Sequence, residues 1–329
     1  MQPHVNPLDC RKDIVKEPLY VVTCITNPMR FWSRYELYHE FEKRMQEAGA
    51  ILYTIEAAYG ERQHAVTCAG NPRHIQLRMK DELWHKENLL NLAIQRLPAD
   101  WKYVAWIDAD IQFTRPDWAA ETVQQLQRYD VLQLFREAVD LGPEYQTHKH
   151  HFGFVWSYMS GIPRKEDASG QYCYTQKGRK GNFYHPGFAW AARRSALDAL
   201  GGLLDVSVLG SADNQMANAF YGMVDRVTHR NVSPGYMEQL LLWQGRAEKY
   251  IRQNVGYLDG TIIHYWHGKK RDRRYTDRWK ILVDEAYDPE FDLKKDTQGL
   301  WQLTDRSVKL RDKIRAYFKA RNEDSIDPE

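Results

Sequence analysis

The sequence predicts an α/β fold, a mostly parallel sheet flanked by helices. An apolar strand at 19–25, an amphipathic helix and a second apolar strand at 50–56 open the chain, and such a β-α-β unit is parallel and right-handed. A further apolar run at 103–107 contains neither Gly nor Pro, as expected of a strand buried on both faces. No stretch reaches 18 apolar residues, so we expect no membrane span.

Composition indicates a globular protein with a sizeable core. Of the 329 residues, 43% are hydrophobic and 27% are charged, which is ordinary globular usage. The net charge of +2 excludes an overall polycation, and the aromatic fraction of 13% suits either ring stacking or core packing. We expect a lead-in at 1–18, one integrated domain at 19–284 and a C-terminal helical extension at 285–329.

Cysteine usage and the N-terminus predict a cytoplasmic location. The four cysteines form no Cys-x-x-Cys pair, which argues against a zinc knuckle or a disulfide scaffold and suits a reducing compartment. The first thirty residues lack the pattern of a signal peptide.

Periodicity and turn residues predict the remaining elements. Strands are expected at 130–135, 187–194 and 260–268, and helices at 83–95, 195–201, 215–221, 237–251 and 305–320. Ser195 is the expected N-cap of its helix. Between 136 and 183 the periodicity fades, which predicts a long irregular stretch covering a site.

Two carboxylates, Asp108 and Asp110, follow the strand at 103–107. Side chains two residues apart on an extended backbone share a face, so both could hold one divalent cation, which prefers oxygen ligands. Ligands of open α/β sheets gather beyond the carboxyl ends of the strands. The alternative is a helix cap or an Asx-turn.

Four landmarks follow one another along the chain: Ile-Asp-Ala-Asp at 107–110, Gly-Phe-Ala-Trp-Ala at 187–191, Ser-Ala-Asp-Asn at 211–214 and His-Tyr-Trp-His-Gly at 264–268. Together with the opening β-α-β unit they resemble the GT-A class of nucleotide-sugar-dependent glycosyltransferases, which has a Rossmann-like fold. The resemblance covers roughly residues 19–280 and is closest to family-two-like enzymes of phages and bacteria.

The resemblance implies a Mn²⁺ or Mg²⁺ ion that neutralises a departing nucleoside diphosphate. Asp108 and Asp110 (the DXD motif) would hold it together with His264 or His267, and a histidine ligand favours Mn²⁺. Asp213 would be the general base of an inverting transfer. It could instead cap its helix, in which case a retaining mechanism without a base stays open. The residues implied to bind the donor, most of all a UDP-sugar, are Thr23, Asn27, Arg30, Glu56, Arg78, Lys86, Asn88, Asp108, Trp190, Lys270 and Arg273.

The acceptor is less constrained by the sequence. Residues 264–280 and 306–321 each hold seven Lys or Arg, which could follow a nucleic-acid backbone or could be a diphosphate clamp followed by a solvated helix. One expectation is therefore a hydroxymethylated base of phage DNA, and the other is a polysaccharide, lipid-linked or protein acceptor. A metal-dependent nucleotidyltransferase and an inactive sugar-binding module are the alternatives from other functional classes.

Overall fold

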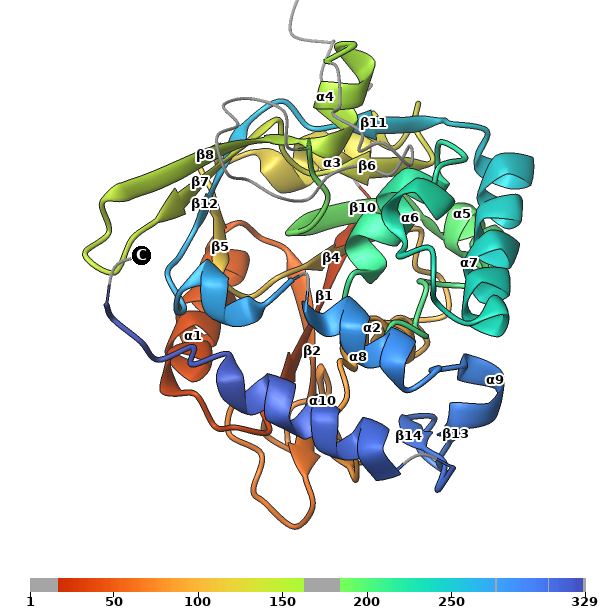
Figure 1. Cartoon of the computed structure of the whole chain (residues 1–329). Helices are drawn as coiled ribbons and strands as arrows, with labels where there is room; N and C mark the ends of the chain where they lie inside the picture. Colours follow the sequence, from red (N-terminus) through yellow and green to blue (C-terminus); the bar gives the residue numbers. More distant parts are fainter. Residues whose placement is uncertain (1–16, 163–183, 276, 307, 328–329) are drawn as a thin grey trace, which may run out of the picture.

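A central seven-stranded sheet carries helices on both faces in the computed structural model, which describes residues 17–162, 184–275, 277–306 and 308–327 (Figure 1). The strand order is β11-β6-β10-β4-β1-β2-β3. Only β10 runs antiparallel to its neighbours, β4 and β6. The predicted mostly parallel sheet flanked by helices is confirmed. Its strands are β1 (Leu19–Thr26), β2 (Ile51–Tyr59), β3 (His74–Met79), β4 (Tyr103–Ile107), β6 (Val131–Gln133), β10 (Ala189–Arg193) and β11 (Val255–Tyr257).

Alternate residues of β1 point to opposite faces and so belong to two hydrophobic cores. Tyr20 and Val22 pack in the larger core, whereas Leu19 and Val21 pack in the smaller one. Helices α1 and α3 cover the smaller core, and α2, α5, α6 and α7 cover the larger (Figure 1). The helices are α1 (Trp32–Glu47), α2 (Lys86–Ile94), α3 (Trp118–Gln125), α4 (Phe154–Met159), α5 (Arg194–Leu200), α6 (Ala212–Ala219), α7 (Pro234–Arg246), α8 (Asp277–Asp284), α9 (Pro289–Asp292) and α10 (Val308–Ala320).

The chain reverses its direction of travel across the sheet at β1. Strands β2 and β3 are added on one side of β1, and β4 then pairs on the other side. Such a reversal leaves a crevice at the carboxyl ends of the two strands, because their connections leave in opposite directions. The fold therefore places a ligand crevice where β1 and β4 end.

A second, five-stranded sheet stands beside this crevice, with the order β5-β12-β7-β8-β9. Strand β12 pairs antiparallel with β5 and parallel with β7. This register sets His264 opposite both Ile111 and Asp140. The strands are β5 (Ile111–Phe113), β7 (Glu137–Leu141), β8 (Thr147–Gly153), β9 (Tyr184–His185) and β12 (Thr261–His264).

The C-terminal part of the chain packs on the same core as the central sheet. Leu310 and Ile314 of α10 belong to the larger hydrophobic core, and α10 lies against α8 (Figure 1). A short hairpin, β13 (Leu293–Lys295) with β14 (Trp301–Leu303), precedes it. None of the helices in the described ranges combines the length and the apolarity that a bilayer crossing requires.

Several predictions of local structure were wrong. Residues 108–110 form a turn between β4 and β5 rather than extended backbone, so the argument that Asp108 and Asp110 share a strand face does not apply. The stretch after 136 is not irregular, because β7, β8 and α4 occupy most of 137–159. The many polar residues of β7 and β8 hide the alternation of polar and apolar side chains by which a strand is recognised. The part of this stretch at 163–183, like the lead-in at 1–16, lies outside the described residues.

The starts of the five predicted helices also differ from the prediction: α6 and α7 begin three residues earlier, at Ala212 and Pro234, and α10 begins three residues later, at Val308. Helix α2 begins at Lys86 instead of residue 83, because the amide of Trp84 donates to the Val208 carbonyl at 2.8 Å and not within a helix. Helix α5 begins at Arg194 with Arg193 at its N-cap, so Ser195 is not the cap. Its end at Gly201 is confirmed, with φ of 75°.

Gly268 lies where the C-terminal segment packs closely against the rest of the fold. It has φ of +83°, and a Cβ there would lie 2.7 Å from the Asn322 carbonyl oxygen and 2.8 Å from Glu323 Cα. We expect Gly268→Ala to lose about 1 kcal/mol of unfolding free energy from the backbone conformation and about 1–3 kcal/mol more from overpacking. Gly49→Ala is the control, because φ is +70° there and nothing lies within 4 Å. Equal losses in urea unfolding would contradict the close approach.

Candidate active site

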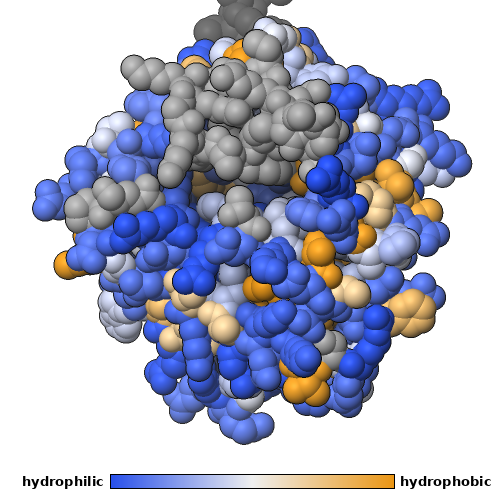
Figure 2. Space-filling view, viewed as in Figure 1, coloured by the Kyte–Doolittle hydropathy of each residue, from blue (hydrophilic) through white to orange (hydrophobic). Residues whose placement is uncertain are grey.

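A cavity of about 260 Å³ opens at the carboxyl ends of β1 and β4. Residues 23–28 line it from β1 and the following turn, and residues 107–110 line it from β4. Side chains from α2, α6, β12 and the C-terminal segment complete the wall. Figure 2 shows that the face seen in Figure 1 is mainly hydrophilic, with hydrophobic side chains in small separate spots. The cavity is therefore the feature that a ligand would fill.

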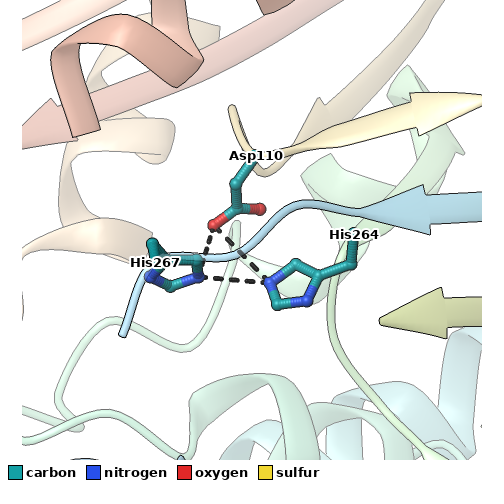
Figure 3. Close-up of side chains that lie close together, drawn as sticks. All are labelled: Asp110, His264 and His267. Carbon is teal, nitrogen blue, oxygen red and sulfur yellow. Dashed lines mark hydrogen bonds and ion pairs between the residues drawn. The ribbon is translucent and has the colours of Figure 1, made fainter. Parts of the chain in front are cut away.

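Asp110, His264 and His267 converge in this cavity (Figure 3). Asp110 comes from the turn before β5, His264 ends β12, and His267 follows in the next loop. Asp110 Oδ2 lies 3.0 Å from His267 Nε2 and 3.9 Å from His264 Nε2. The two Nε2 atoms are 3.1 Å apart. The pairing of β5 with β12 brings the three side chains together across more than 150 residues of sequence.

The three side chains fit a divalent metal ion. Ligand atoms about 2.1 Å from one ion lie about 3 Å apart when their bonds to the ion meet at a right angle. His267 Nε2 lies at such a distance from both Asp110 Oδ2, at 3.0 Å, and His264 Nε2, at 3.1 Å. Asp110 Oδ1 is buried and, among the described residues, has no hydrogen-bond partner, although buried carboxylate oxygens are normally satisfied. A ligand set of one oxygen and two nitrogens suits Mn²⁺ better than Mg²⁺.

The protonation states favour metal binding. Burial alone would raise the pKa of Asp110, but His267 and His264 hold it well below its usual range. Burial, with the nearby Arg273 guanidinium, lowers the pKa of His267. An ionised carboxylate and a neutral imidazole are the forms that bind a cation.

Asp108 also lines the cavity, but its partner is Lys86 and not the two histidines. Its Oδ1 makes a close ion pair with Lys86 Nζ, and it is not part of the Asp110, His264 and His267 group. Burial raises the pKa of Asp108, against the opposing effect of Lys86. The next residue, Glu87, also lines the cavity, and burial raises its pKa to about 8. Lys86 thus offers a partly buried cation in the same cavity as the candidate metal ligands.

Further cations line the same cavity. Lys270 Nζ contacts Asp140 Oδ2 closely, and Arg273 donates toward the His267 ring from 3.1 Å. Arg34 and Arg321 both pair with the buried carboxylate of Glu323. Guanidinium and ammonium groups bind phosphate oxygens strongly, so the cavity suits a diphosphate.

The structure brings ten of the residues singled out from the sequence to this cavity: Thr23, Asn27, Lys86, Asp108, Asp110, Asp213, His264, His267, Lys270 and Arg273. The other five, Arg30, Glu56, Arg78, Asn88 and Trp190, are absent from its lining.

The side chains of four of these five are engaged elsewhere. Glu56 accepts hydrogen bonds from the amides of residues 65–67, and Arg78 donates to the carbonyls of Gly60 and Arg62. Asn88 donates to the Gly299 carbonyl at 3.1 Å. Trp190 Nε1 donates to the Pro186 carbonyl at 2.8 Å, which steadies the segment beside the cavity.

Several cavity residues were not identified from the sequence: Arg34, Glu87, His151, His185, Arg321 and Glu323. Glu323 had no sequence signal, since it lies in a polar tail, and it is 1% exposed. The cluster of histidines at 148–151 could have drawn attention to His151, but short strands with polar residues gave no clear period there.

Comparisons with known proteins identify similar solved structures only. No family model matches the chain, and no curated protein matches its sequence. Nucleotide-sugar transferases are among the similar structures. A Drosophila β1,4-galactosyltransferase 7 mutant with manganese, UDP-Gal and xylobiose is 10% identical, covering 90% of this chain and 98% of that one, with a TM-score of 0.38.

The catalytic domain of the same enzyme with xylobiose matches over 61% of this chain and 60% of that one, at 11% identity and a TM-score of 0.29. Glucosyl-3-phosphoglycerate synthase from Mycobacterium tuberculosis, with Mn²⁺, UDP-glucose and phosphoglyceric acid, is 10% identical over 94% of each chain, with a TM-score of 0.38. At these TM-scores the folds correspond only loosely.

The placement of the two aspartates predicts unequal effects on metal binding. We expect Asp110→Asn to weaken Mn²⁺ binding more than about tenfold, because it removes the charge that faces both imidazoles. Asp108→Asn should weaken binding less in the protein without nucleotide, because Asp108 pairs with Lys86. Isothermal titration of Mn²⁺ into each variant measures this. A larger loss in Asp108→Asn would show that Asp108 is the stronger ligand.

Proposed function

We propose that this protein is a metal-dependent glycosyltransferase that moves a sugar from a nucleotide sugar to an acceptor hydroxyl. The observation that carries the proposal is the meeting of Asp110, His264 and His267 with buried cations in one cavity at the switch point of the sheet. A nucleotide-binding β-α-β unit uses this crevice for its ligand. A UDP-sugar is the proposed donor, as the sequence resemblance implies.

Asp110, His264 and His267 would hold Mn²⁺, with Asp108 as a further candidate once nucleotide is present. Bound there, the ion would act as a Lewis acid that stabilises the negative charge of the diphosphate leaving group. Lys270 and Arg273 would bind and orient the same diphosphate. Thr23 and Asn27, at the end of β1, would lie beside the nucleoside.

Asp213 is the proposed general base of an inverting transfer. It lies in the first turn of α6 and lines the cavity. The absence of a side chain at Gly187 lets its carboxylate approach, since a Cβ there would lie 2.7 Å from Asp213 Oδ2. The amide of Asn214 donates to Asp213 Oδ1 at 2.7 Å, which orients the carboxylate and leaves its other oxygen to take the proton of an acceptor hydroxyl.

The charge pattern favours a glycan-type acceptor over DNA. Several cations in 264–280 and 306–321 that lie outside the cavity are paired within the fold: Lys280 with Asp284, Arg311 with Asp81, Lys313 with Glu285 and Arg315 with Glu82. Paired cations release fewer counterions on binding a phosphate backbone. A hydroxymethylated base of phage DNA is the second candidate, supported by exposed cations such as Arg271, whose side chain is 69% exposed and whose ion pair with Asp272 is long, at 3.7 Å.

Donor turnover tests the proposed function. We expect slow hydrolysis of one member of a UDP-, GDP- and dTDP-sugar panel with Mn²⁺, and none after chelation, because the ion stabilises the leaving group. Nucleotide release measured by a coupled assay reports it. If no nucleotide sugar binds or turns over with any divalent ion, the proposal fails.

The base is tested on the identified donor and acceptor. Asp213→Asn should lower kcat about 10²- to 10⁴-fold while the Kd of the nucleotide stays unchanged, because the carboxylate acts on the acceptor. Asp198→Asn on the exposed surface of α5 is the matched control. Ser211 and not Asp213 is the N-cap of α6, so unchanged kcat in Asp213→Asn would leave this residue without a catalytic role. The anomeric configuration of the product, read by NMR, decides between inversion and retention.

Offering glycan and DNA acceptors in parallel separates the two acceptor classes. We expect label from the sugar donor to enter an oligosaccharide and not a duplex containing 5-hydroxymethylcytosine, because the basic segments are largely paired. Mass spectrometry of both products measures this, and transfer to the duplex alone would reverse the preference.

A further inference from the structure

Asp140 is a buried carboxylate with three partners beside the candidate metal ligands. Its Oδ1 lies 2.8 Å from His264 Nδ1, and its Oδ2 lies 2.5 Å from His151 Nε2. The same Oδ2 makes a close ion pair with Lys270 Nζ. The residue is 2% exposed, so these contacts are made away from solvent.

The contact with His264 determines which ring nitrogen carries the proton. An ionised carboxylate can only accept hydrogen bonds, so the hydrogen between Asp140 Oδ1 and His264 Nδ1 belongs to the imidazole. A neutral imidazole with its proton on Nδ1 presents a lone pair at Nε2. That Nε2 is the atom that lies 3.1 Å from His267 Nε2 and faces Asp110.

The strand register makes this arrangement a property of the sheet and not of one flexible side chain. Asp140 of β7 and His264 of β12 are directly opposite each other in a parallel pair. On its other edge β12 pairs with β5, where His264 is opposite Ile111, the residue after Asp110. The pairing of β12 with β7 therefore fixes His264 beside its hydrogen-bond acceptor, Asp140, and the pairing of β12 with β5 fixes His264 near Asp110.

We propose that Asp140 is the positioning residue of the metal centre: it holds His264 in the tautomer that offers Nε2 to the ion, and through its other oxygen it keeps Lys270 at the cavity wall. The inference rests on the proposed function, since it concerns the same metal site. Histidine ligands of metals commonly donate their second ring N–H to a carboxylate, and loss of that partner costs about 10- to 100-fold in affinity.

Mn²⁺ titration of the full chain tests the proposal. We expect Asp140→Ala to weaken Mn²⁺ binding about 10- to 100-fold and Asp140→Asn to weaken it less, because an amide oxygen can still accept from Nδ1–H. Glu137→Gln is the matched control: it makes the same change of charge on the same strand, where Glu137 pairs with Arg136 outside the site. It should bind Mn²⁺ as the unaltered protein does.

A second readout separates positioning from a general loss of structure. In the metal-free protein, ¹⁵N chemical shifts of the histidine rings should assign the proton of His264 to Nδ1, and Asp140→Ala should move it toward Nε2. Lys270→Met removes the ion pair but keeps the contact with His264, so the tautomer should stay unchanged in this variant. If Asp140→Ala does not fold, the Mn²⁺ titration and the ¹⁵N measurement are made on Asp140→Asn and Lys270→Met.

The outcomes distinguish this inference from the proposed function. Failure of the unaltered protein to bind Mn²⁺ would overturn the metal centre itself, and the inference with it. Normal Mn²⁺ binding in the unaltered protein together with binding within twofold in Asp140→Ala, or an Nε2-protonated His264 in the unaltered protein, would overturn the role of Asp140 alone.

Discussion

The pairing of β12 between β5 and β7 is the constraint on which the candidate site depends. It sets His264 opposite Asp140 on one edge and opposite Ile111 on the other, so one strand joins a metal ligand, its hydrogen-bond acceptor and the turn that carries Asp110. Backbone ladders specify register strongly, because a slip of one residue turns every side chain to the other face. The placement of His264 relative to Asp110 is thus fixed by backbone hydrogen bonds, among them that of the Tyr265 amide with the Asp110 carbonyl at 2.9 Å.

The sequence allows the crevice to be predicted, but only part of what lines it. Buried parallel strands are recognised in a sequence as continuous apolar runs, and the strand that ends before Asp108 could be located on that basis. Asp110 was predicted for a reason that does not hold, since residues 108–110 form a turn. The ligands nevertheless meet, because the turn sends Asp110 toward the second sheet while Asp108 stays beside Lys86. Local periodicity carries no information about this division between two sheets.

Asp140 and Glu323 show why the remaining site residues could not be predicted. Each is a single carboxylate in a segment without clear periodicity, and each becomes significant only through a contact distant in sequence: Asp140 with His264, and Glu323 with Arg34. Buried charges are tolerated when they are paired and hydrogen-bonded. The cations beside the cavity are accordingly held by carboxylates, and an anionic ligand entering it meets guanidinium and ammonium groups that are already ordered.

The C-terminal segment completes this arrangement by tying the end of the chain to its beginning. Asp324 accepts hydrogen bonds from the amides of Trp32 and Ser33, both at 2.8 Å, where the helix dipole of α1 favours an anion. Trp266 Nε1 donates to the Ser325 carbonyl at 2.7 Å, which ties the tail to the loop that carries His267. Glu323, next to Asp324 in the chain, has its Oε2 3.9 Å from His267 Nδ1. One histidine of the candidate metal centre is therefore backed by a neighbouring strand and the other by the C-terminal segment, which is itself held by the start of α1.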